Sequence, residues 1–144
     1  MWYYEGEEFT SEMIGECIGF VYCITDLING NKKYIGKKNF YSTRRLPPLK
    51  GKTRKRKVVK ESDWQNYFGS SEEVKLLVEA QGADAFHREI LHLCHSKGEM
   101  SYIETKEQFD REVLLSDEYY NGIINCRINR SHVKKLADSR DTGT

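Results

Sequence analysis

The chain has 144 residues, the size of one domain that can bury a single core without disulfides or a structural metal. Its composition, 38% hydrophobic and 31% charged, is hydrophilic and globular, and no apolar run reaches the roughly 20 residues needed to span a bilayer. The first residues, MWYYEGEEFTSE, are acidic and aromatic, unlike a secretory signal or an Arg-rich transit peptide. We therefore expect one soluble domain, residues 1–144, that works in the cytoplasm without a membrane partner.

The net charge of +1 hides an uneven distribution of charge along the chain. From Lys32 to Lys60 there are thirteen Lys or Arg and no acid, whereas the rest of the chain holds all 22 acids against ten bases. Such a single-sign field repels itself unless a polyanion neutralises it, so it predicts a phosphate-binding surface. For the run KGKTRKRK, residues 50–57, a disordered basic loop or a nuclear-localisation-like run is an equal alternative.

The first predicted elements form a β-hairpin. Residues 1–15 have the character of a variable lead-in. Residues 17–25, CIGFVYCIT, are rich in β-branched and aromatic residues, which favours a strand, and residues 32–36, KKYIG, predict a second one. Between them, LINGN contains an Asn-Gly pair, which favours a tight reversal.

The segment after the hairpin is expected to be the least ordered part of the chain. Residues 37–63 lack apolar periodicity and contain Pro47 and Pro48. These features predict a short helical piece over 40–45, followed by an exposed basic loop at about 46–63.

Two helices and a strand are predicted in the second half. Ser70 with Glu73 three residues later has the pattern of a capping box, and Gly82 is placed to end a helix that runs to about Ala80. Residues 85–94, AFHREILHLC, predict a third strand.

Ser96 with Glu99 repeats the capping-box pattern and opens a second helix over about 97–114. At 100° per residue, Glu104 lies at the edge of its apolar side, where a carboxylate leans over a sheet and remains accessible to solvent. The expected apolar side consists of Met100, Tyr102, Ile103, Phe109, Val113 and Leu114.

The four cysteines never occur as a CxxC pair, which favours reduced core thiols over a disulfide framework. The cluster from His92 to His95 is a poor zinc candidate, because strand alternation sends Cys94 to the opposite face from His95. We expect His87 and His92 to be structural as well.

A group of residues around the hairpin has the chemistry that a nuclease needs. Cleaving a phosphodiester requires an activated water, neutralised charge on the phosphoryl oxygens and a stabilised leaving oxygen, which a metal held by few carboxylates plus an Arg can supply. Tyr22 and Tyr34 lie near strand ends beside the basic cluster, Arg44 follows shortly after, and Glu104 lies on the later helix.

These residues resemble the GIY-YIG endonuclease family. The stretch Gly19-Phe20-Val21-Tyr22 is similar to the first motif, and Tyr34-Ile35-Gly36 is the second motif itself, with eleven residues between the two tyrosines. Arg44 follows Tyr34 by ten residues, the place of the family's catalytic arginine, and Glu104 stands in the place of its metal-binding glutamate. YFGSS, residues 67–71, and EYYNGIINCRIN, residues 118–129, look most like phage-encoded members. The resemblance covers roughly residues 17–127.

The resemblance implies an α/β fold in which a small three-stranded antiparallel sheet, flanked by helices, carries the active site. Tyr22 would then act as general base or position the water, and Tyr34 would hydrogen-bond near the water or the phosphate. Arg44 would hold the scissile phosphate in a planar fork, with Arg45 as the alternative if the register shifts by one. Several relatives have a histidine before the helix that begins here at Ser70, and this chain has Tyr67, Phe68 and Gly69 instead, which gives Tyr67 a candidate role.

The family's metal site implies that Glu104 binds one Mg²⁺ or Mn²⁺, largely through water and substrate oxygens. Lys37 or Lys38 would support a phosphate oxygen and lower a tyrosine pKa by its charge. The relatives' late asparagine corresponds to Asn121 or Asn125. We take Asn125, because the apolar pattern after it would tie it to the sheet.

The partner implied by the family and the charge is double-stranded DNA, bound through phosphate contacts with modest sequence specificity, unless a homodimer reads a longer site. Trp64, just after the basic run, either stacks on an unpaired base or covers the core. The expected nucleic-acid-binding residues are Lys37, Arg45, Lys50, Lys52, Arg54, Lys55, Arg56, Lys57 and Lys60.

The sequence therefore predicts a metal-dependent DNA endonuclease. A stand-alone phage homing nuclease in a bacterial host comes first among the settings, then a phage nuclease that degrades host DNA, then a restriction enzyme. The alternatives are a non-catalytic nucleic-acid-binding module on the same fold, and a ribonuclease or branched-DNA resolvase.

Overall fold

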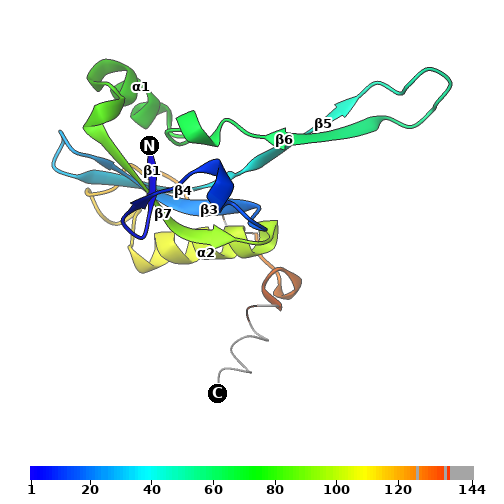
Figure 1. Cartoon of the computed structure of the whole chain (residues 1–144). Coiled ribbons are helices and arrows are strands. Elements are labelled where there is room, and N and C mark those ends of the chain that lie inside the picture. The colour runs from blue at the N-terminus through cyan, green and yellow to red at the C-terminus, as the bar shows by residue number, and fades with distance from the viewer. Residues whose placement is uncertain (126, 135, 137–144) are drawn as a thin grey trace.

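A computed structural model describes residues 1–125, 127–134 and 136 of the chain, and it shows a mixed sheet with one helix on each face (Figure 1). The strand order in this sheet is β2-β1-β7-β3-β4. Its strands are β1 (Trp2–Tyr4), β2 (Glu7–Glu8), β3 (Gly19–Asp26), β4 (Lys32–Asn39) and β7 (Phe86–Cys94). The predicted α/β class is confirmed.

The three predicted strands form the antiparallel part of the sheet. β3 and β4 pair along their whole length from Gly19 opposite Asn39 to Asp26 opposite Lys32, so the predicted hairpin is confirmed. β7 pairs with the other side of β3, with a register shift between Val21 and Tyr22. This arrangement leaves β4 at an edge of the sheet.

The expectation of a three-stranded sheet with a variable lead-in is wrong at the N-terminus. β1 pairs in parallel with β7, and β2 pairs antiparallel with β1, so the sheet has five strands. Trp2 is 1% exposed, and its indole N–H donates to the carbonyl of Trp64 over 2.7 Å. The lead-in is part of the core because its aromatic side chains, Trp2 and Phe9 among them, are buried there.

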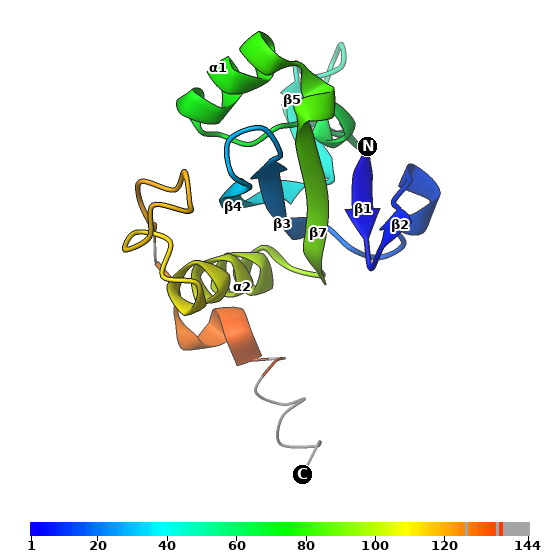
Figure 2. The ribbon, with the colours of Figure 1, turned by 90° about the vertical axis from the view of Figure 1, so that its left-hand side faces the viewer.

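The two helices lie on opposite sides of the sheet (Figure 2), and a hydrophobic cluster lies on each face of the sheet. One face carries Phe20 and Tyr22 and packs against α1 (Glu72–Gln81) and Trp64. The other face carries Val21 and packs against α2 (Lys97–Asp110). Of the two alternatives for Trp64, the structure shows the core position, because that side chain is 1% exposed and unavailable for base stacking.

The ends of both helices differ slightly from the predictions. The side chain that caps α1 is Ser71, which accepts a hydrogen bond from the Val74 N–H, rather than Ser70. Ser96 caps α2 as expected, by accepting from the Glu99 N–H. α2 ends at Asp110, so Leu114 lies beyond the helix and is 49% exposed, and Phe109, within its last turn, is 59% exposed instead of buried.

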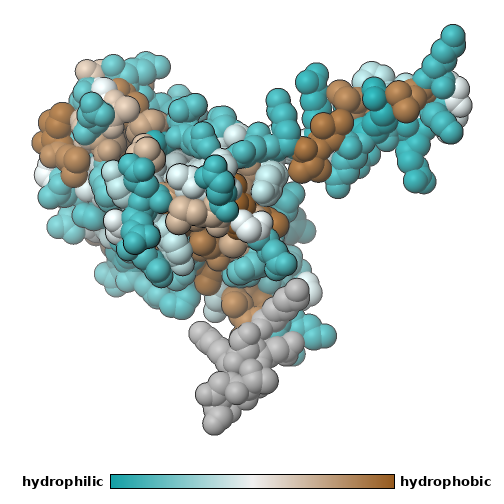
Figure 3. Space-filling view, viewed as in Figure 1, coloured by the Kyte–Doolittle hydropathy of each residue, from teal (hydrophilic) through white to brown (hydrophobic). Residues whose placement is uncertain are grey.

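The largest departure from the predictions is in residues 41–61, which we call the arm. Where a short helix and a loop were expected, β5 (Tyr41–Leu46) and β6 (Arg56–Glu61) pair in a separate two-stranded antiparallel sheet. This sheet projects away from the rest of the molecule, which we call the body (Figures 1 and 3). Thr43, Val58 and Val59 are β-branched, and such residues favour strands and cross-strand pairing. This strand propensity was missed in the sequence because the segment has no apolar alternation.

The arm is attached to the body at Phe40, which is fully buried. The Phe40 N–H donates to the Ile18 carbonyl over 2.9 Å, and the Phe40 carbonyl accepts from the Ser62 N–H over 2.8 Å. At the far end the ladder stops at Leu46 and Arg56, because Pro47 and Pro48 have no N–H to donate. Only residues 47–55, the tip, are the exposed basic loop that was expected.

Two further expectations concern the thiols and the membrane. Cys17, Cys23 and Cys94 are buried and unbonded to one another, as predicted for core thiols, while Cys126 lies outside the described residues. In the part of the chain that the structure describes, no helix is long and apolar enough to cross a membrane.

Candidate active site

Three tyrosines meet on one face of the sheet, next to its β4 edge. The ring centroid of Tyr22, on β3, lies 6.3 Å from that of Tyr34 on β4 and 6.0 Å from that of Tyr67, in the loop before α1. The Tyr34 hydroxyl is 2.9 Å from the hydroxyl of Ser70. The two motif tyrosines are therefore neighbours, and the loop before α1 completes their surroundings.

Gly36 is required because the ring of Tyr22 lies directly over it. A Cβ added at Gly36 would lie 2.6 Å from Cζ of Tyr22, closer than real Cβ contacts allow. Gly69 has φ of +92°, a conformation open to glycine, and a Cβ there would meet both Tyr34 and the Tyr22 hydroxyl at 3.3–3.4 Å. The glycine of the second motif thus makes the space that the tyrosine of the first motif fills.

One stretch of the β4 edge is covered by the segment after α2. The Lys33 N–H donates to the Glu118 carbonyl, and the Tyr120 N–H donates to the Lys33 carbonyl. Asn121 then accepts from the Ile35 N–H over 3.0 Å and donates to the Ile35 carbonyl over 2.8 Å. The amide side chain therefore takes the place of a neighbouring strand.

Asn121, 8% exposed, thus makes the sheet contact that we had expected of Asn125, and that expectation is wrong. Asn125 is exposed. Beyond Ile35, the next residue whose backbone faces outward is Lys37, and among the described residues it has no backbone partner on that side. The edge of the sheet is therefore open beside the tyrosines.

Glu104, on α2 at the other face of the sheet, lies within electrostatic range of Lys37, Tyr22 and Tyr34. It is partly buried and forms no ion pair with any described residue. Burial raises the pKa of Glu104, and the positive charge of Lys37 opposes that rise. Lys37 is held over α2 by donating to the Ser101 hydroxyl across 2.8 Å.

Lys38 lies on the tyrosine face. Its Nζ is 4.2 Å from the centroid of the Tyr67 ring and 2.7 Å from a carboxylate oxygen of Asp63. That pairing holds the pKa of Asp63 below its ordinary value. Lys37 and Lys38 therefore place one positive charge on each side of the open edge.

The two motif tyrosines, Tyr22 and Tyr34, have a raised pKa. Burial, first, and then the neighbouring Tyr67, Tyr34 and Glu104 raise the pKa of Tyr22 well above its ordinary value. Burial also raises the pKa of Tyr34, and the hydrogen bond with Ser70 opposes that rise. Loss of a proton from Tyr22 therefore requires added positive charge near its hydroxyl.

The donor set at this edge fits a hard divalent cation held by one protein ligand. No group of three or more His, Cys, Asp or Glu that could chelate a metal occurs among residues 1–125, 127–134 and 136. A single partly buried carboxylate with no protein cation bound to it suits Mg²⁺, which keeps several waters and takes further oxygens from a phosphate.

The predicted clamp, Arg44, lies on strand β5 of the arm rather than on a short helix, and it pairs with Val58 across the ladder. Arg45 is opposite Lys57. The side chains of both arginines are exposed and make no hydrogen bond or ion pair with any residue that the structure describes. The arm, with β5, β6 and the tip, also carries the predicted DNA-binding residues from Arg45 to Lys60, while Lys37 lies on β4.

The comparison with known families agrees with this geometry. A family model described as "Putative endonuclease segE, GIY-YIG domain" matches residues 2–124. The chain belongs to the GIY-YIG endonuclease family. Comparisons with curated proteins and with solved structures give no match. The membership makes the chain a nuclease domain, with DNA as the substrate class that goes with the family.

The match also shows why the lead-in was misjudged. It starts at residue 2, so the GIY-YIG domain includes the N-terminal strands that we had treated as a tail. The apolar aromatic Trp2 beside Tyr3 and Tyr4 was the available signal, because three aromatics in sequence favour a strand. Gly69 was missed as well, since its positive φ is visible only in three dimensions.

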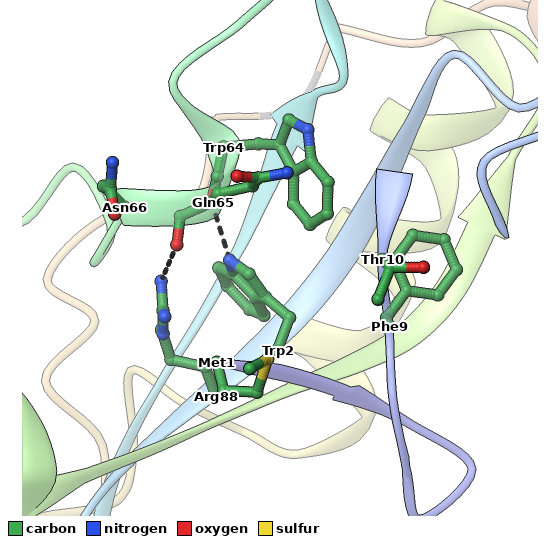
Figure 4. Close-up of a pocket in the computed structure, with 8 residues that line it drawn as sticks. All are labelled: Met1, Trp2, Phe9, Thr10, Trp64, Gln65, Asn66 and Arg88. Carbon is green, nitrogen blue, oxygen red and sulfur yellow. Dashed lines mark hydrogen bonds between the residues drawn. The ribbon is translucent and has the colours of Figure 1, made fainter. Parts of the chain in front are cut away.

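A separate pocket lies away from this edge, between the N-terminal strands and the Trp64 loop (Figure 4). Arg88, on β7, is 5% exposed and donates from one nitrogen to the carbonyls of Gln65 and Tyr67. Burial lowers the pKa of Arg88 to about 10. Because its guanidinium holds the loop that carries Tyr67, Arg88 supports the position of that ring over Tyr22.

Proposed function

We propose that this GIY-YIG domain is a metal-dependent endonuclease that hydrolyses phosphodiester bonds of double-stranded DNA at the open edge of β4. The observation that carries the proposal is the convergence of Tyr22, Tyr34, Lys37, Lys38 and Glu104 on that edge, where the sheet backbone has no partner among the described residues. Nucleophile activation, charge neutralisation and access for a phosphate are thereby combined in one place.

Tyr22 orients the attacking water and takes its proton. The phenol is neutral in the free protein because burial raises its pKa. It releases its own proton to solvent only as positive charge arrives with the substrate complex, and the phenolate then accepts the proton of the attacking water, so proton transfer is linked to correct loading of the site. Tyr34, fixed by the Ser70 hydroxyl, orients the water or the phosphate from the strand next to Tyr22.

Glu104 would hold one Mg²⁺ or Mn²⁺, which supplies Lewis-acid stabilisation of the phosphoryl and leaving oxygens when it is bound. Lys37 and Lys38 neutralise phosphate charge on the two sides of the edge. Arg44 contacts the DNA from the first part of the arm, in place of the helix position expected from the sequence.

The test is a plasmid cleavage assay with Mg²⁺, with Mn²⁺ and with EDTA. Glu104→Gln keeps the size of the side chain and removes its charge, and we expect a loss of at least about 10²-fold in cleavage rate. Glu79→Gln, on the exposed side of α1, is the matched control and retains the wild-type rate. Intact DNA in every metal, together with a gel shift, supports a non-catalytic binding module instead.

The role of Tyr22 is tested by the pH dependence of the rate. Because the pKa of Tyr22 is raised, the phenolate fraction grows about tenfold per pH unit below that pKa, and the wild-type rate rises over this range. Tyr22→Phe lowers the rate by about 10²–10⁴-fold and flattens its pH profile. A Phe variant that keeps the wild-type slope places the proton acceptor elsewhere.

We also propose that the protein is a stand-alone homing-type nuclease of a phage and that it acts in the cytoplasm of the bacterial host. RNA or branched DNA as substrate is tested by offering both in the same assay. Mapping the cut ends shows whether a homodimer cuts both strands together.

A further inference from the structure

The arm concentrates the positive charge of the molecule. Residues 41–61 hold nine Lys or Arg and one acid, a net charge of +8 on a chain whose total is +1, so the remaining residues carry −7. The single acid, Glu61, is occupied at the base of the arm, where it accepts from the Ser11 hydroxyl and from the Trp64 indole N–H. The part of the arm that projects is therefore purely cationic.

The arm has no hydrophobic core of its own. Val58 and Val59 are 39% and 57% exposed, and Leu49 at the tip is 52% exposed. An isolated two-stranded ribbon is marginally stable in water, and here like charges repel along both strands. Such a ribbon gains most from a partner that supplies negative charge together with apolar contact.

The strand register divides the arm into two faces. Residues directly opposite each other in an antiparallel ladder share a face, and successive pairs alternate. One face has three basic side chains and two aliphatic ones, and the other has two basic side chains and Glu61. The more basic face consists of Ser42, Arg44, Leu46, Arg56, Val58 and Lys60.

This face alternates the two kinds of side chain that read DNA bases. Arg44 is opposite Val58, and Leu46 is opposite Arg56, so a guanidinium lies beside an aliphatic group at two neighbouring pairs of this face. In the major groove, Arg and Lys bind guanine O6 and N7, and aliphatic groups contact the thymine methyl.

The dimensions of the arm also suit that groove. The major groove of B-DNA is about 12 Å wide and admits a two-stranded ribbon, whose strands are about 4.8 Å apart. Six residues of β5 at about 3.3 Å each extend roughly 20 Å, which corresponds to about six base pairs along the axis. The tip then provides further cations for the phosphates, with Gly51, at φ of +83°, in the turn closed by the Lys52 N–H and the Leu49 carbonyl.

We propose that the arm lies in the major groove of double-stranded DNA with the face of Arg44, Arg56 and Lys60 toward the bases, while the tip contacts phosphates. This inference rests on the proposed function for its choice of DNA and adds base readout to it. It replaces the modest specificity expected of a loop, because a paired ribbon holds its side chains in fixed register.

The first experiment measures affinity by fluorescence anisotropy with the full chain in EDTA, so that no cleavage is needed. A 30-base-pair duplex is titrated between about 50 and 200 mM salt. We expect the double variant Lys52→Gln/Lys55→Gln, at the exposed tip, to lower the slope of log affinity against log salt by about 2, since each phosphate contact contributes about 0.9. Lys75→Gln/Lys106→Gln, two exposed lysines of α1 and α2, is the charge-matched control and leaves the slope unchanged. Equal slopes for the two double variants overturn the proposal.

The second experiment distinguishes contacts in the major groove from contacts with the phosphate backbone. A duplex of the same sequence with 5-propynyl pyrimidines has a filled major groove and an unaltered phosphate charge, and we expect wild-type affinity to fall at least tenfold on it. We expect a similar loss of affinity for the matching RNA duplex, because its major groove is too narrow for the arm. Unchanged affinity for either duplex overturns groove insertion.

The two proposals fail separately. If the plasmid stays intact under every metal while the propynyl duplex binds weakly, the nuclease assignment fails and the groove assignment stands. If Glu104→Gln abolishes cleavage while the propynyl duplex binds like the unmodified one, the nuclease stands and the arm acts outside the groove.

Discussion

The body and the arm of this protein are both built on antiparallel pairing, but different forces stabilise them. In the body, β3 is paired on both sides and covered on both faces, and its residues from Gly19 to Ile24 are all buried. In the arm, every residue of β6 is exposed, and the ladder is the sole regular structure. The body is therefore set by packing and tolerates little change, whereas the arm is free to vary for its partner.

The largest expected effect is in the body, at the contact between Gly36 and Tyr22. Gly36→Ala brings a methyl group against the Tyr22 ring, which costs about 1–3 kcal/mol of unfolding free energy and displaces the hydroxyl. We expect cleavage to fall by about 10²-fold or more, because displacements of about 1 Å have that effect. Urea unfolding and initial cleavage rates measure the two consequences.

Gly122→Ala is the control for this change. A Cβ at Gly122 meets no heavy atom within 4 Å, and its φ lies outside the left-handed region. We expect both its stability and its rate to match the wild type. Equal losses in the two alanine variants contradict the contact between the motifs.

The next effect concerns the covered stretch of the β4 edge. Asn121→Ala leaves the buried Ile35 N–H without its partner and weakens the bonding of the Ile35 carbonyl, which also accepts from Gln108. We expect a loss of about 2–3 kcal/mol in urea unfolding. Asn125→Ala, at an exposed position, changes stability by less than about 0.5 kcal/mol, and a larger loss there reverses the assignment.

A smaller, pH-dependent effect comes from Asp26 at the end of β3. Burial raises its pKa, but hydrogen bonds from Asn29, Tyr120 and the backbone outweigh it, so the folded pKa is below the ordinary value. The ionised Asp26 carboxylate therefore stabilises the folded state fully above the pKa of the unfolded state, about 4. This stabilisation is lost as the pH falls through the pKa of the folded state. Asp26→Asn costs about 1–2 kcal/mol at pH 7, and the difference from wild type narrows in acid.

Thermal or urea unfolding from pH 7 to pH 2 follows this difference. The exposed Asp84→Asn is the control, and its curve stays parallel to that of the wild type. A constant gap for Asp26→Asn across the whole range argues against the ionised carboxylate as the stabilising group.

The smallest expected effect tests the arm. Val58→Ala/Val59→Ala removes four methyl groups from exposed positions and changes the unfolding free energy by less than about 0.5 kcal/mol. Val74→Ala, in the core below α1, costs about 2 kcal/mol for half as many methyl groups. A large loss of unfolding free energy in the arm variant shows that the arm also packs on the body, and it contradicts the view that packing stabilises the body alone.

The same contrast explains which parts of the structure could be predicted from the sequence. The β3–β4 hairpin, both helices and β7 were recognised because burial imposes a regular apolar pattern on their sequences and because capping residues mark the limits of the helices. β5 and β6 were missed because a strand exposed on both faces has no such pattern, and its pairing is visible only in three dimensions.

The candidate site residues also divide into those whose positions could be predicted from the sequence and those whose positions could not. Tyr22, Tyr34 and Glu104 were predicted and are brought to one edge, because motif spacing along paired strands and a helix determines their relative places. Asn121 was passed over for Asn125, since the path of an irregular tail decides which side chain reaches Ile35. Arg44 was expected on a helix that does not form, so its placement depended on β5, an exposed strand without an apolar pattern in the sequence.

The uncovered stretch of β4 has a consequence for solubility. An exposed sheet edge is a template on which a second copy of a chain can add its own strand, and natural proteins counter this with lysines along the edge. Lys37 and Lys38 occupy that stretch, while Asn121 blocks the adjoining one. Neutralising both lysines therefore removes a barrier to edge-to-edge aggregation, and light scattering belongs beside every rate measured on such a variant.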